Sequence, residues 1–330
     1  MSTIDLLAIV TRCDFPSGQG PIGDHLGLAR FSASRPRLVV RTIALNTRQM
    51  RLNIAGDAIQ LTPGDETPID LSKVRLILYM PVCLEIEETN LAATAPNEPY
   101  SLFAAQQWRP VTGYLEEHLA RRIRCVNEPR FTRLANNKLI QHATLRGARI
   151  ELPQTVVSTG YPVTSPLGSY PRLVRKNLSE GGWKSETEFS PARLVSRNET
   201  WEATPAIWQA PIDADHEYRV YVMGEEVIFV RLERERAAFD VRMTRGGRPQ
   251  ARIVRGGTGW KDSMRAAAKA LRLDYAVIDA MPVEDRLVVL EVNANGVWWF
   301  LPDEVGDELE RRFHAFLDRL LAISPRAVLT

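Results

Sequence analysis

The sequence predicts a mixed α/β (α+β) protein of two domains, and three observations support this prediction. The chain has 330 residues, which is about twice the length of an ordinary domain. Apolar, β-branched runs at residues 4–10 and 37–45 lie on either side of a short stretch with helical character, as in a β-α-β unit. After Cys125 the pattern changes to strands joined by short turns, which is typical of antiparallel sheet. We therefore expect domains at residues 1–125 and 126–330.

The first of these is predicted to be a small α/β domain. Residues 24–31 fit a short helix between the first two strands, and a third strand at residues 74–79 follows a polar segment with Pro and Gly. Residues 101–122 have the apolar spacing of a helix, interrupted once by Pro110. The order of these elements is that of an α/β domain.

The second domain is predicted to combine antiparallel strands with three helices. The helices are expected at about residues 130–146, at 262–271 with Asp262 as the N-cap, and at 303–322. Two strands at 217–222 and 226–231 are joined by a turn at 223–225, and a second pair is expected at 275–280 and 287–292. The remaining strands are predicted at residues 154–159, 171–178, 193–196 and 206–209.

Composition excludes several classes of protein. Forty-two basic side chains against 40 acidic ones give a net charge of +2, so we expect no nucleic-acid partner. The cysteines, Cys13, Cys83 and Cys125, are odd in number and form no CxxC pair, which favours a reducing cytoplasm over a disulfide framework or a zinc site. The longest apolar run, residues 76–84, is about half the ~20 residues that cross a bilayer, so no membrane span is expected.

A formal G-x-G-x-x-G follows the first strand at residues 18–23, but its context does not favour a dinucleotide site. Seven residues separate the strand from Gly18, Pro21 lacks an N–H, and no acidic residue ends the second strand to hold a ribose. No G-x-x-x-x-G-K-[ST] sequence occurs. We therefore expect residues 18–23 to form a loop without a nucleotide.

The strongest cluster of functional residues lies in the last predicted strand pair. If this hairpin is centred near Asp285, Asp279 lies opposite Glu291, and Glu291 and Asn293 project from the same strand face. Two opposed carboxylates repel each other, so a positive group is expected between them, and oxygen ligands of this kind suit Mg²⁺ shared with phosphates. The alternative is a solvated acidic pair, which the surrounding Val, Leu and Ile residues argue against.

The segment EVNANGVWW at residues 291–299, with Asp279 and the upstream strand beginning Glu217-Tyr-Arg-Val-Tyr, resembles the ATP-grasp ligases. It is most similar to the graspetide (microviridin-type) peptide cyclases and the ribosomal-protein glutamate ligases. These enzymes typically read EVNPxGQW, so Ala294 and Val297 are departures. The W-Y-R-R-P segment of the peptide cyclases is replaced here by Leu-Tyr-Met-Pro at residues 78–81.

The resemblance covers residues 126–330 and implies the ATP-grasp fold. In this fold two α+β lobes, here about residues 126–210 and 211–330, clasp ATP, and a small pre-ATP-grasp α/β domain precedes them. The implied cofactors are ATP and Mg²⁺. The implied metal ligands are Asp279, Glu291 and Asn293.

The resemblance also assigns residues to the nucleotide. Lys138 matches a lysine that contacts the phosphates, and Lys176 matches the lysine of V-x-K-P, with Asn177 in place of the proline. A phosphate-covering loop is implied at Gly181 and Gly182. The linker between the lobes is expected to read the adenine and the ribose through Gln209, Ala210, Ile212 and Asp213, with Asp215 as the alternative ribose contact and Pro211 excluded because it lacks an N–H.

Three further residues are implied to act on the transferred group. Arg219 matches an arginine aimed at the phosphoryl group or acyl phosphate, and Asn295 is placed to present the acceptor. Arg255 adds a second phosphate or carboxylate contact, or belongs to an Arg-rich turn.

The activity implied by the resemblance is ADP-forming ligation through an acyl phosphate, which an amine or hydroxyl then attacks to give an amide or ester. The expected substrate is a ribosomal peptide or, as the alternative, a free amino acid or small metabolite. A non-catalytic nucleotide- or peptide-binding relative is a third hypothesis, against which the three metal ligands argue. Some ATP-grasp ligases are dimers, so a homodimer is among the expected states.

Overall fold

The computed structural model describes most of the chain and divides it into two compact units. One unit comprises residues 1–132 and 308–330, and the other comprises residues 133–307. The loop at 18–23, Cys13, Cys83, Gly181 and Gly182 lie outside the described residues. The described residues are 3–10, 26–44, 50–63, 66–80, 99–162, 166–178, 183–184, 189–190, 192–196, 204–234 and 249–323.

The first unit contains a four-stranded parallel sheet of strand order β2-β1-β6-β7. The two central strands, β1 and β6, are nearly continuous apolar runs, as expected for a parallel sheet, which is usually buried on both faces. Leu115 and Leu119 of the long helix pack into the core of this unit. The elements are β1 (Ile4–Val10), α2 (Leu28–Ala33), β2 (Val40–Ala44), β6 (Val74–Met80), α4 (Pro99–Arg122) and β7 (Arg124–Val126).

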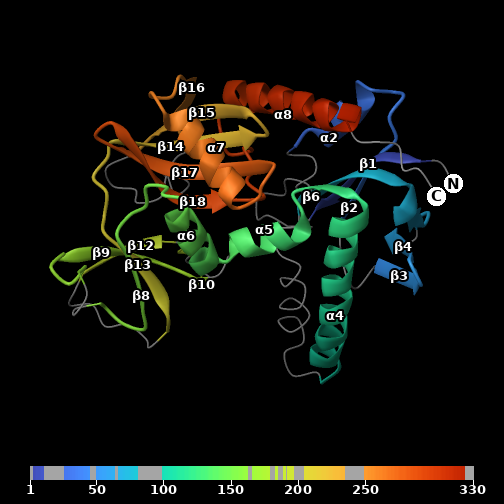
Figure 1. Ribbon diagram of the computed structural model, residues 1–330, viewed down its shortest axis with the longest axis horizontal. Helices are drawn as coiled ribbons and strands as arrows, with labels where there is room; N and C mark the ends of the chain where they lie inside the picture. The colour runs from blue at the N-terminus through green and yellow to red at the C-terminus, as the bar shows by residue number, and fades with distance from the viewer. Residues whose placement is uncertain are drawn as a thin grey trace. The chain divides into compact units, whose positions relative to one another are not determined.

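Helix α4 differs from its prediction because it continues through Pro110. It runs for 24 residues, the longest helix of the described chain (Figure 1). A proline inside a helix removes one backbone hydrogen bond, and the fixed φ of its ring is still compatible with helical backbone. The expected break at Pro110 is therefore wrong.

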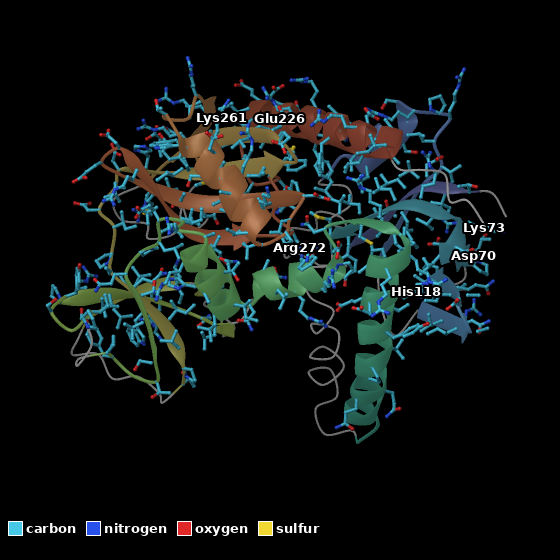
Figure 2. The ribbon with its side chains drawn as sticks, viewed as in Figure 1. Asp70, Lys73, His118, Glu226, Lys261 and Arg272 are labelled. Carbon is cyan, nitrogen blue, oxygen red and sulfur yellow. The ribbon has the colours of Figure 1, made fainter. Side chains whose placement is uncertain are left out.

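A three-stranded antiparallel sheet lies where the sequence was interpreted as a polar segment. It consists of β3 (Met50–Ala55), β4 (Ala58–Pro63) and β5 (Ile69–Asp70), and Gly56, with φ +58°, occupies the turn between the first two strands. The carboxylate of Asp70 accepts the N–H of Ser72 and so caps the short helix η1 (Leu71–Lys73). Lys73 Nζ lies 4.0 Å from the same carboxylate (Figure 2).

The second unit contains a four-stranded antiparallel sheet of order β12-β9-β13-β8. One face packs Leu173, Val195 and Trp208 into a core. Because side chains alternate along a strand, Lys176 and Gln209 project from the opposite face. The strands are β8 (Thr155–Ser158), β9 (Arg172–Lys176), β12 (Ala192–Ser196) and β13 (Ala206–Gln209), and β10 (Trp183–Lys184) pairs separately with β11 (Phe189–Ser190).

A five-stranded antiparallel sheet of order β16-β15-β14-β17-β18 completes the second unit (Figure 1). Helix α7 packs on one of its faces, where the Tyr218 and Trp260 rings lie 5.2 Å apart. By alternation, Glu217 and Arg219 project from the other face. Both predicted hairpins are confirmed. The elements are β14 (His216–Met223), β15 (Glu226–Glu233), β16 (Ala251–Val254), α7 (Trp260–Ala270), β17 (Tyr275–Val283) and β18 (Arg286–Asn293).

Two helix predictions need correction. The single helix expected at 130–146 is two helices, α5 (Pro129–Asn136) and α6 (Lys138–Gly147). They separate at Asn137, whose backbone is extended and whose side chain accepts the N–H groups of Leu139 and Ile140 as an N-cap. Helix α7 begins two residues before Asp262, after Gly259 in the left-handed region, so Asp262 lies in the first turn and is not the cap.

The terminal helix α8 (Asp303–Ile323) confirms the prediction at 303–322. Within the described part of the chain, no helix combines the length and the apolar character needed to cross a membrane.

Candidate active site

A cleft in the second unit lies between its four-stranded and its five-stranded antiparallel sheet. Lys176 of β9 and Gln209 of β13 line it from the four-stranded sheet. Arg219, Asp279 and Glu291 line it from the five-stranded sheet. Charged side chains from segments far apart in the sequence therefore meet in one cleft.

The charged residues of the larger sheet form a row across three neighbouring strands. Arg219 on β14 pairs with Asp279 on β17, and Asp279 pairs with Glu291 on β18. The predicted register, with Asp279 opposite Glu291, is thus confirmed. A register shift beside Asp279 leaves Leu290 as an extra residue, a β-bulge, and both Leu290 and Glu291 line the cleft.

Each carboxylate of the row faces a cation of the protein. Arg219 Nη1 donates to Asp279 Oδ1 at 2.7 Å, and Lys138 Nζ lies 3.4 Å from Glu291 Oε1. Asn293 Nδ2 donates to the other oxygen of Asp279 at 3.2 Å. The positive groups that the opposed carboxylates require are therefore Arg219 and Lys138.

The guanidinium of Arg219 is buried and held on all three nitrogens. Nε donates to the Tyr221 hydroxyl at 3.2 Å, and Nη2 donates to the carbonyl of Val297 at 3.4 Å. Burial lowers the pKa of Arg219, but the Asp279 carboxylate and Tyr221 outweigh this and the pKa is raised. Burial raises the pKa of Tyr221 to about 12. Arg219 therefore remains charged, and two of its five N–H groups are left for a ligand.

The turn after β18 positions the Val297 carbonyl that Arg219 uses. Gly296 lies against β17 so closely that a Cβ there would be 2.4 Å from Val277 Cβ, and its carbonyl accepts the Tyr275 hydroxyl at 2.5 Å. Trp298 is 3% exposed, with its ring 6.2 Å from Tyr221. Val297 contacts Arg219 through its backbone oxygen, which any residue supplies. Valine in place of the glutamine of the EVNPxGQW pattern therefore leaves this contact intact.

Replacing Gly296 with alanine is expected to destabilise the protein by about 1–3 kcal/mol, because the new methyl group overlaps Val277. Urea unfolding measures this change. Gly113→Ala is the matched control, since nothing lies within 4 Å of its Cβ position and alanine favours its helix. Equal stabilities of the two variants would contradict the close packing of this turn.

The two predicted phosphate lysines reach the cleft from different elements. Lys138 is the first residue of α6, placed there by the Asn137 cap, and Lys176 ends β9. Burial lowers the pKa of Lys176, Lys138 lowers it further, and the Glu291 carboxylate opposes the shift. Two ammonium groups and at least one carboxylate therefore interact electrostatically across the cleft.

Gln141 is a buried residue that the sequence interpretation missed. Its Nε2 donates to the carbonyls of Ala135 at 2.6 Å and Val292 at 2.7 Å, and its Oε1 accepts the Val292 N–H at 3.0 Å. Val292 lies between Glu291 and Asn293, so one amide ties the helix of Lys138 to the strand of both side chains. The two groups of Val292 are 151 residues away in the chain, so no local pattern indicates this contact.

Changing Gln141 to leucine is expected to lower the free energy of unfolding by about 2–4 kcal/mol, because both polar groups of Val292 lose their partner in a buried place. Guanidinium unfolding tests this. Gln250→Leu, at an exposed position beside β16, serves as the control. A loss no larger than in the control would show that Gln141 does not fasten α6 to β18.

The structure brings most of the predicted site together. Asn293 is connected to the cleft residues through its hydrogen bond to Asp279. Asp213, Asp215 and Arg255 are exposed and do not line the cleft, and Asn295 is half-buried in the turn after β18. The predicted residues that line the cleft are Lys138, Lys176, Gln209, Ala210, Ile212, Arg219, Asp279 and Glu291.

Two charged residues and one aromatic residue of the cleft were not assigned a role from sequence. They are Glu217, Arg234 and Phe300. Glu217 is two residues before Arg219 on β14, so strand alternation alone places it on the same face. The Phe300 ring lies 5.2 Å from the Arg219 guanidinium.

The linker at residues 209–212 has few backbone donors left for a ligand. The Ala210 N–H donates to the Gln154 carbonyl at 3.1 Å, and Pro211 has none. The Gln209 side chain donates to Thr155 Oγ1 at 3.1 Å. The Ile212 N–H has no backbone partner among the described residues, so it is the donor of this segment for a ligand.

The donor set of Asp279, Glu291 and Asn293 fits Mg²⁺ when a phosphate completes it. Proteins bind Mg²⁺ through one or two carboxylates, with waters and substrate phosphates as the other ligands. The described residues contain no group of three or more His, Cys, Asp or Glu side chains that could hold a metal. The oxygen ligands of these three side chains are thus compatible with a metal that arrives with a phosphate ligand.

Comparison with known proteins identifies the fold. No family model and no curated protein matches the sequence. The macrocyclase MdnC of Microcystis aeruginosa, solved with the precursor peptide MdnA, has a TM-score of 0.71 and 16% identity over 96% of this chain and 99% of that chain. The ATP-grasp ligase PsnB, complexed with minimal precursor, Mg and ADP, has a TM-score of 0.69 and 16% identity over 96% and 99%.

A third structure broadens the comparison beyond peptide-modifying enzymes. D-alanine–D-alanine ligase of Bacillus anthracis has a TM-score of 0.58 and 13% identity over 98% of this chain and 97% of that chain. The protein therefore has the ATP-grasp fold, as the sequence resemblance implied.

Proposed function

We propose that this protein is an ATP-dependent, ADP-forming carboxylate ligase. The observation that carries the proposal is the row of Arg219, Asp279 and Glu291 across three strands, facing Lys138 and Lys176 in one cleft. Cations and carboxylates in this arrangement are what a magnesium–triphosphate complex needs for binding. A solvated acidic hairpin would not place Arg219 in a buried ion pair with Asp279.

The nucleotide is proposed to lie along the cleft from the linker to the lysines. The Ile212 N–H reads the adenine edge, and Val174 and Met281 pack against the base. Glu217, and not the exposed Asp213, accepts the ribose hydroxyls. Lys138 and Lys176 then hold the phosphates as point charges.

Asp279, Glu291 and Asn293 are proposed to hold the metal. When bound, Mg²⁺ neutralises the charge that develops on the β- and γ-phosphate oxygens. Arg219, already fixed by Asp279, Tyr221 and the Val297 carbonyl, points its remaining N–H groups at the transferred phosphoryl group.

The proposed reaction has two steps. A substrate carboxylate attacks the γ-phosphorus in line, and the bond to ADP breaks as the acyl phosphate forms. An amine or hydroxyl then attacks the acyl carbon, phosphate leaves, and the nucleophile loses its proton. The protein contributes alignment and charge stabilisation, without covalent catalysis.

The proposed substrate is a ribosomal peptide. The solved MdnC and PsnB structures, which this chain resembles, contain precursor peptides, and this supports the proposal. The likeness to D-alanine–D-alanine ligase favours a second candidate, ligation of a free amino acid.

The proposal is tested by incubating the purified protein with ATP, Mg²⁺ and the short peptides encoded beside its gene. ADP release together with loss of one water per bond, measured by mass spectrometry, is the expected result. ADP release with a panel of free amino acids, and no peptide product, would favour the second candidate. Absence of ATP binding in calorimetry would overturn both.

ATP binding is expected to take up protons at pH values above the lowered pKa of Lys176. Burial lowers the pKa of Lys176 in the free protein, and a triphosphate beside it adds negative charge that raises this pKa again. Between the two pKa values the complex holds a proton that the free protein lacks, so affinity falls as the pH rises through the lower value. Calorimetry in buffers of different ionisation enthalpy measures the uptake. If the Lys176→Arg variant took up as many protons on ATP binding as the wild-type protein, the proton would bind to a group other than Lys176.

A further inference from the structure

A second cavity, of about 500 Å³, adjoins the nucleotide cleft. It lies between helix α6 and the strands β8 and β13, and its volume is in the range of small-ligand sites. The two cavities share the lining residues Lys138, Lys176, Gln209, Leu290 and Glu291. A molecule in the second cavity therefore reaches the carboxylates and lysines of the proposed phosphoryl-transfer site.

The walls of this cavity are largely apolar and partly open to solvent. Leu152, Ile207 and Leu290 line it, together with Leu139 of α6 and Val157 of β8. Leu139 is 45% exposed and Val157 is 42% exposed, which is high for aliphatic side chains of regular elements. An apolar ligand group would cover this surface and gain the free energy of burial.

Basic side chains run along the helix side of the cavity. Lys138, His142 and Arg146 are spaced four residues apart on α6, so they form one stripe. Glu291 is the single acidic residue among the described residues that line the cavity, and it already faces Lys138. The cavity is therefore suited to a ligand with carboxylates.

His142, between the two charged residues of this stripe, is neutral. Its ring is hydrogen-bonded to the Pro153 carbonyl, and its Nε2 is buried without a hydrogen-bond partner among the described residues. Burial, and then Arg146, lower the pKa of His142, so the imidazole is neutral at pH 7. Because this ring carries no charge, Lys138 and Arg146 supply the positive charge of the stripe.

We propose that this second cavity binds an extended, acidic and apolar segment of the peptide substrate and leads its carboxylates to the nucleotide cleft. The proposal rests on the ligase function proposed above. Arg146 pairs with a carboxylate at the outer end, Leu139 and Val157 cover apolar side chains, and the path ends at Lys138 and Lys176. Charge complementarity and continuity with the nucleotide cleft favour this occupant over a neutral metabolite.

The test measures binding of two fluorescein-labelled probes, a repeat of Gly-Glu-Leu and a repeat of Gly-Lys-Leu, by fluorescence anisotropy at low salt. Wild-type protein is expected to bind the acidic probe at least about tenfold more tightly than the basic one. Arg146→Glu is expected to remove this preference, and Val157→Asp to weaken binding of the acidic probe. Arg252→Glu, an exposed arginine of β16, makes the same charge change elsewhere and is expected to behave as wild type.

The two proposals fail in different ways. ATP affinity is measured on every variant, and Arg146→Glu is expected to retain it, because Arg146 lines only the second cavity. Retained ATP binding with equal affinity for both probes would overturn the peptide path and leave the ligase function standing. An effect of Arg146→Glu equal to that of Arg252→Glu would also overturn it. If the wild-type protein did not bind ATP, the proposed ligase function itself would be contradicted.

Discussion

Replacing Lys176 by alanine is expected to reduce kcat/KM for ATP by at least about 100-fold, which corresponds to about 2.7 kcal/mol. Glu217, Asp279 and Glu291 all act on the charge of Lys176. Without the ammonium group the triphosphate loses one of its two proposed lysine contacts and is repelled more strongly by these carboxylates, so both ATP binding and transition-state stabilisation are weakened. ADP formation gives the rate, and calorimetry gives the dissociation constant of ATP.

The controls separate this effect from a general loss of positive charge. Lys261→Ala removes an exposed lysine of α7 and is expected to leave both quantities unchanged (Figure 2). Lys176→Arg is expected to retain binding better than alanine, because the charge stays in the cleft. Full activity of Lys176→Ala with an intact fold would remove Lys176 from the proposed site.

Changing Glu291 to glutamine is expected to raise the Mg²⁺ concentration for half-maximal activity by at least about tenfold and to lower kcat by at least about 100-fold. The substitution removes one of two carboxylates proposed to hold the metal. It also frees Lys138 from its ion pair and removes a negative charge beside the phosphates, so metal-free ATP is expected to bind at least as tightly as to wild type. Activity across a Mg²⁺ series and calorimetry with ATP in chelator test these expectations.

Glu284→Gln, at the exposed turn of the same hairpin, is the matched control and is expected to have wild-type metal dependence. If Glu291→Gln bound ATP more weakly in the absence of metal and kept the wild-type Mg²⁺ dependence, Glu291 would act on the nucleotide directly and not through a cation.

The part of the fold that follows from local patterns could be predicted from the sequence. The β17–β18 hairpin is an example, because a two-residue turn near Asp285 and the alternation of strand side chains fix the partner of each residue. Beyond Ala280, however, the turn alone would pair Asp279 with Leu290, and the extra residue of the bulge shifts the pairing so that Asp279 lies opposite Glu291. The predicted metal ligands were placed by this register, whereas Lys138 and Lys176 were placed by the resemblance to the ATP-grasp family.

Other features depend on tertiary context that the sequence does not display. Asn137 fits inside a helix as well as at its start, and its capping role becomes visible only when α6 changes direction there. The β3–β4 hairpin is different, because its strands MRLNIA and AIQLTP do alternate apolar and polar residues, and this signal was missed when the segment was interpreted as polar. Gln141 forms hydrogen bonds with both backbone groups of Val292, and these two segments are far apart in the chain.

The predicted site residues that lie in loops also depend on tertiary context that the sequence does not display. Asp213 and Arg255 were assigned by their positions in the family pattern, yet both side chains are exposed and neither lines the cleft. Strand residues such as Arg219 and Glu217 have a face fixed by alternation, whereas the direction of a loop side chain depends on the path of the whole loop.

Crystals grown with Mn²⁺ and a non-hydrolysable ATP analogue test the central claim most directly, because Mn²⁺ replaces Mg²⁺ at oxygen sites and its anomalous signal locates it. The account predicts an anomalous peak within coordination distance of the Asp279 and Glu291 carboxylates, with the triphosphate between that peak and Lys138 and Lys176. A peak elsewhere, or a nucleotide bound away from this cleft, would contradict it.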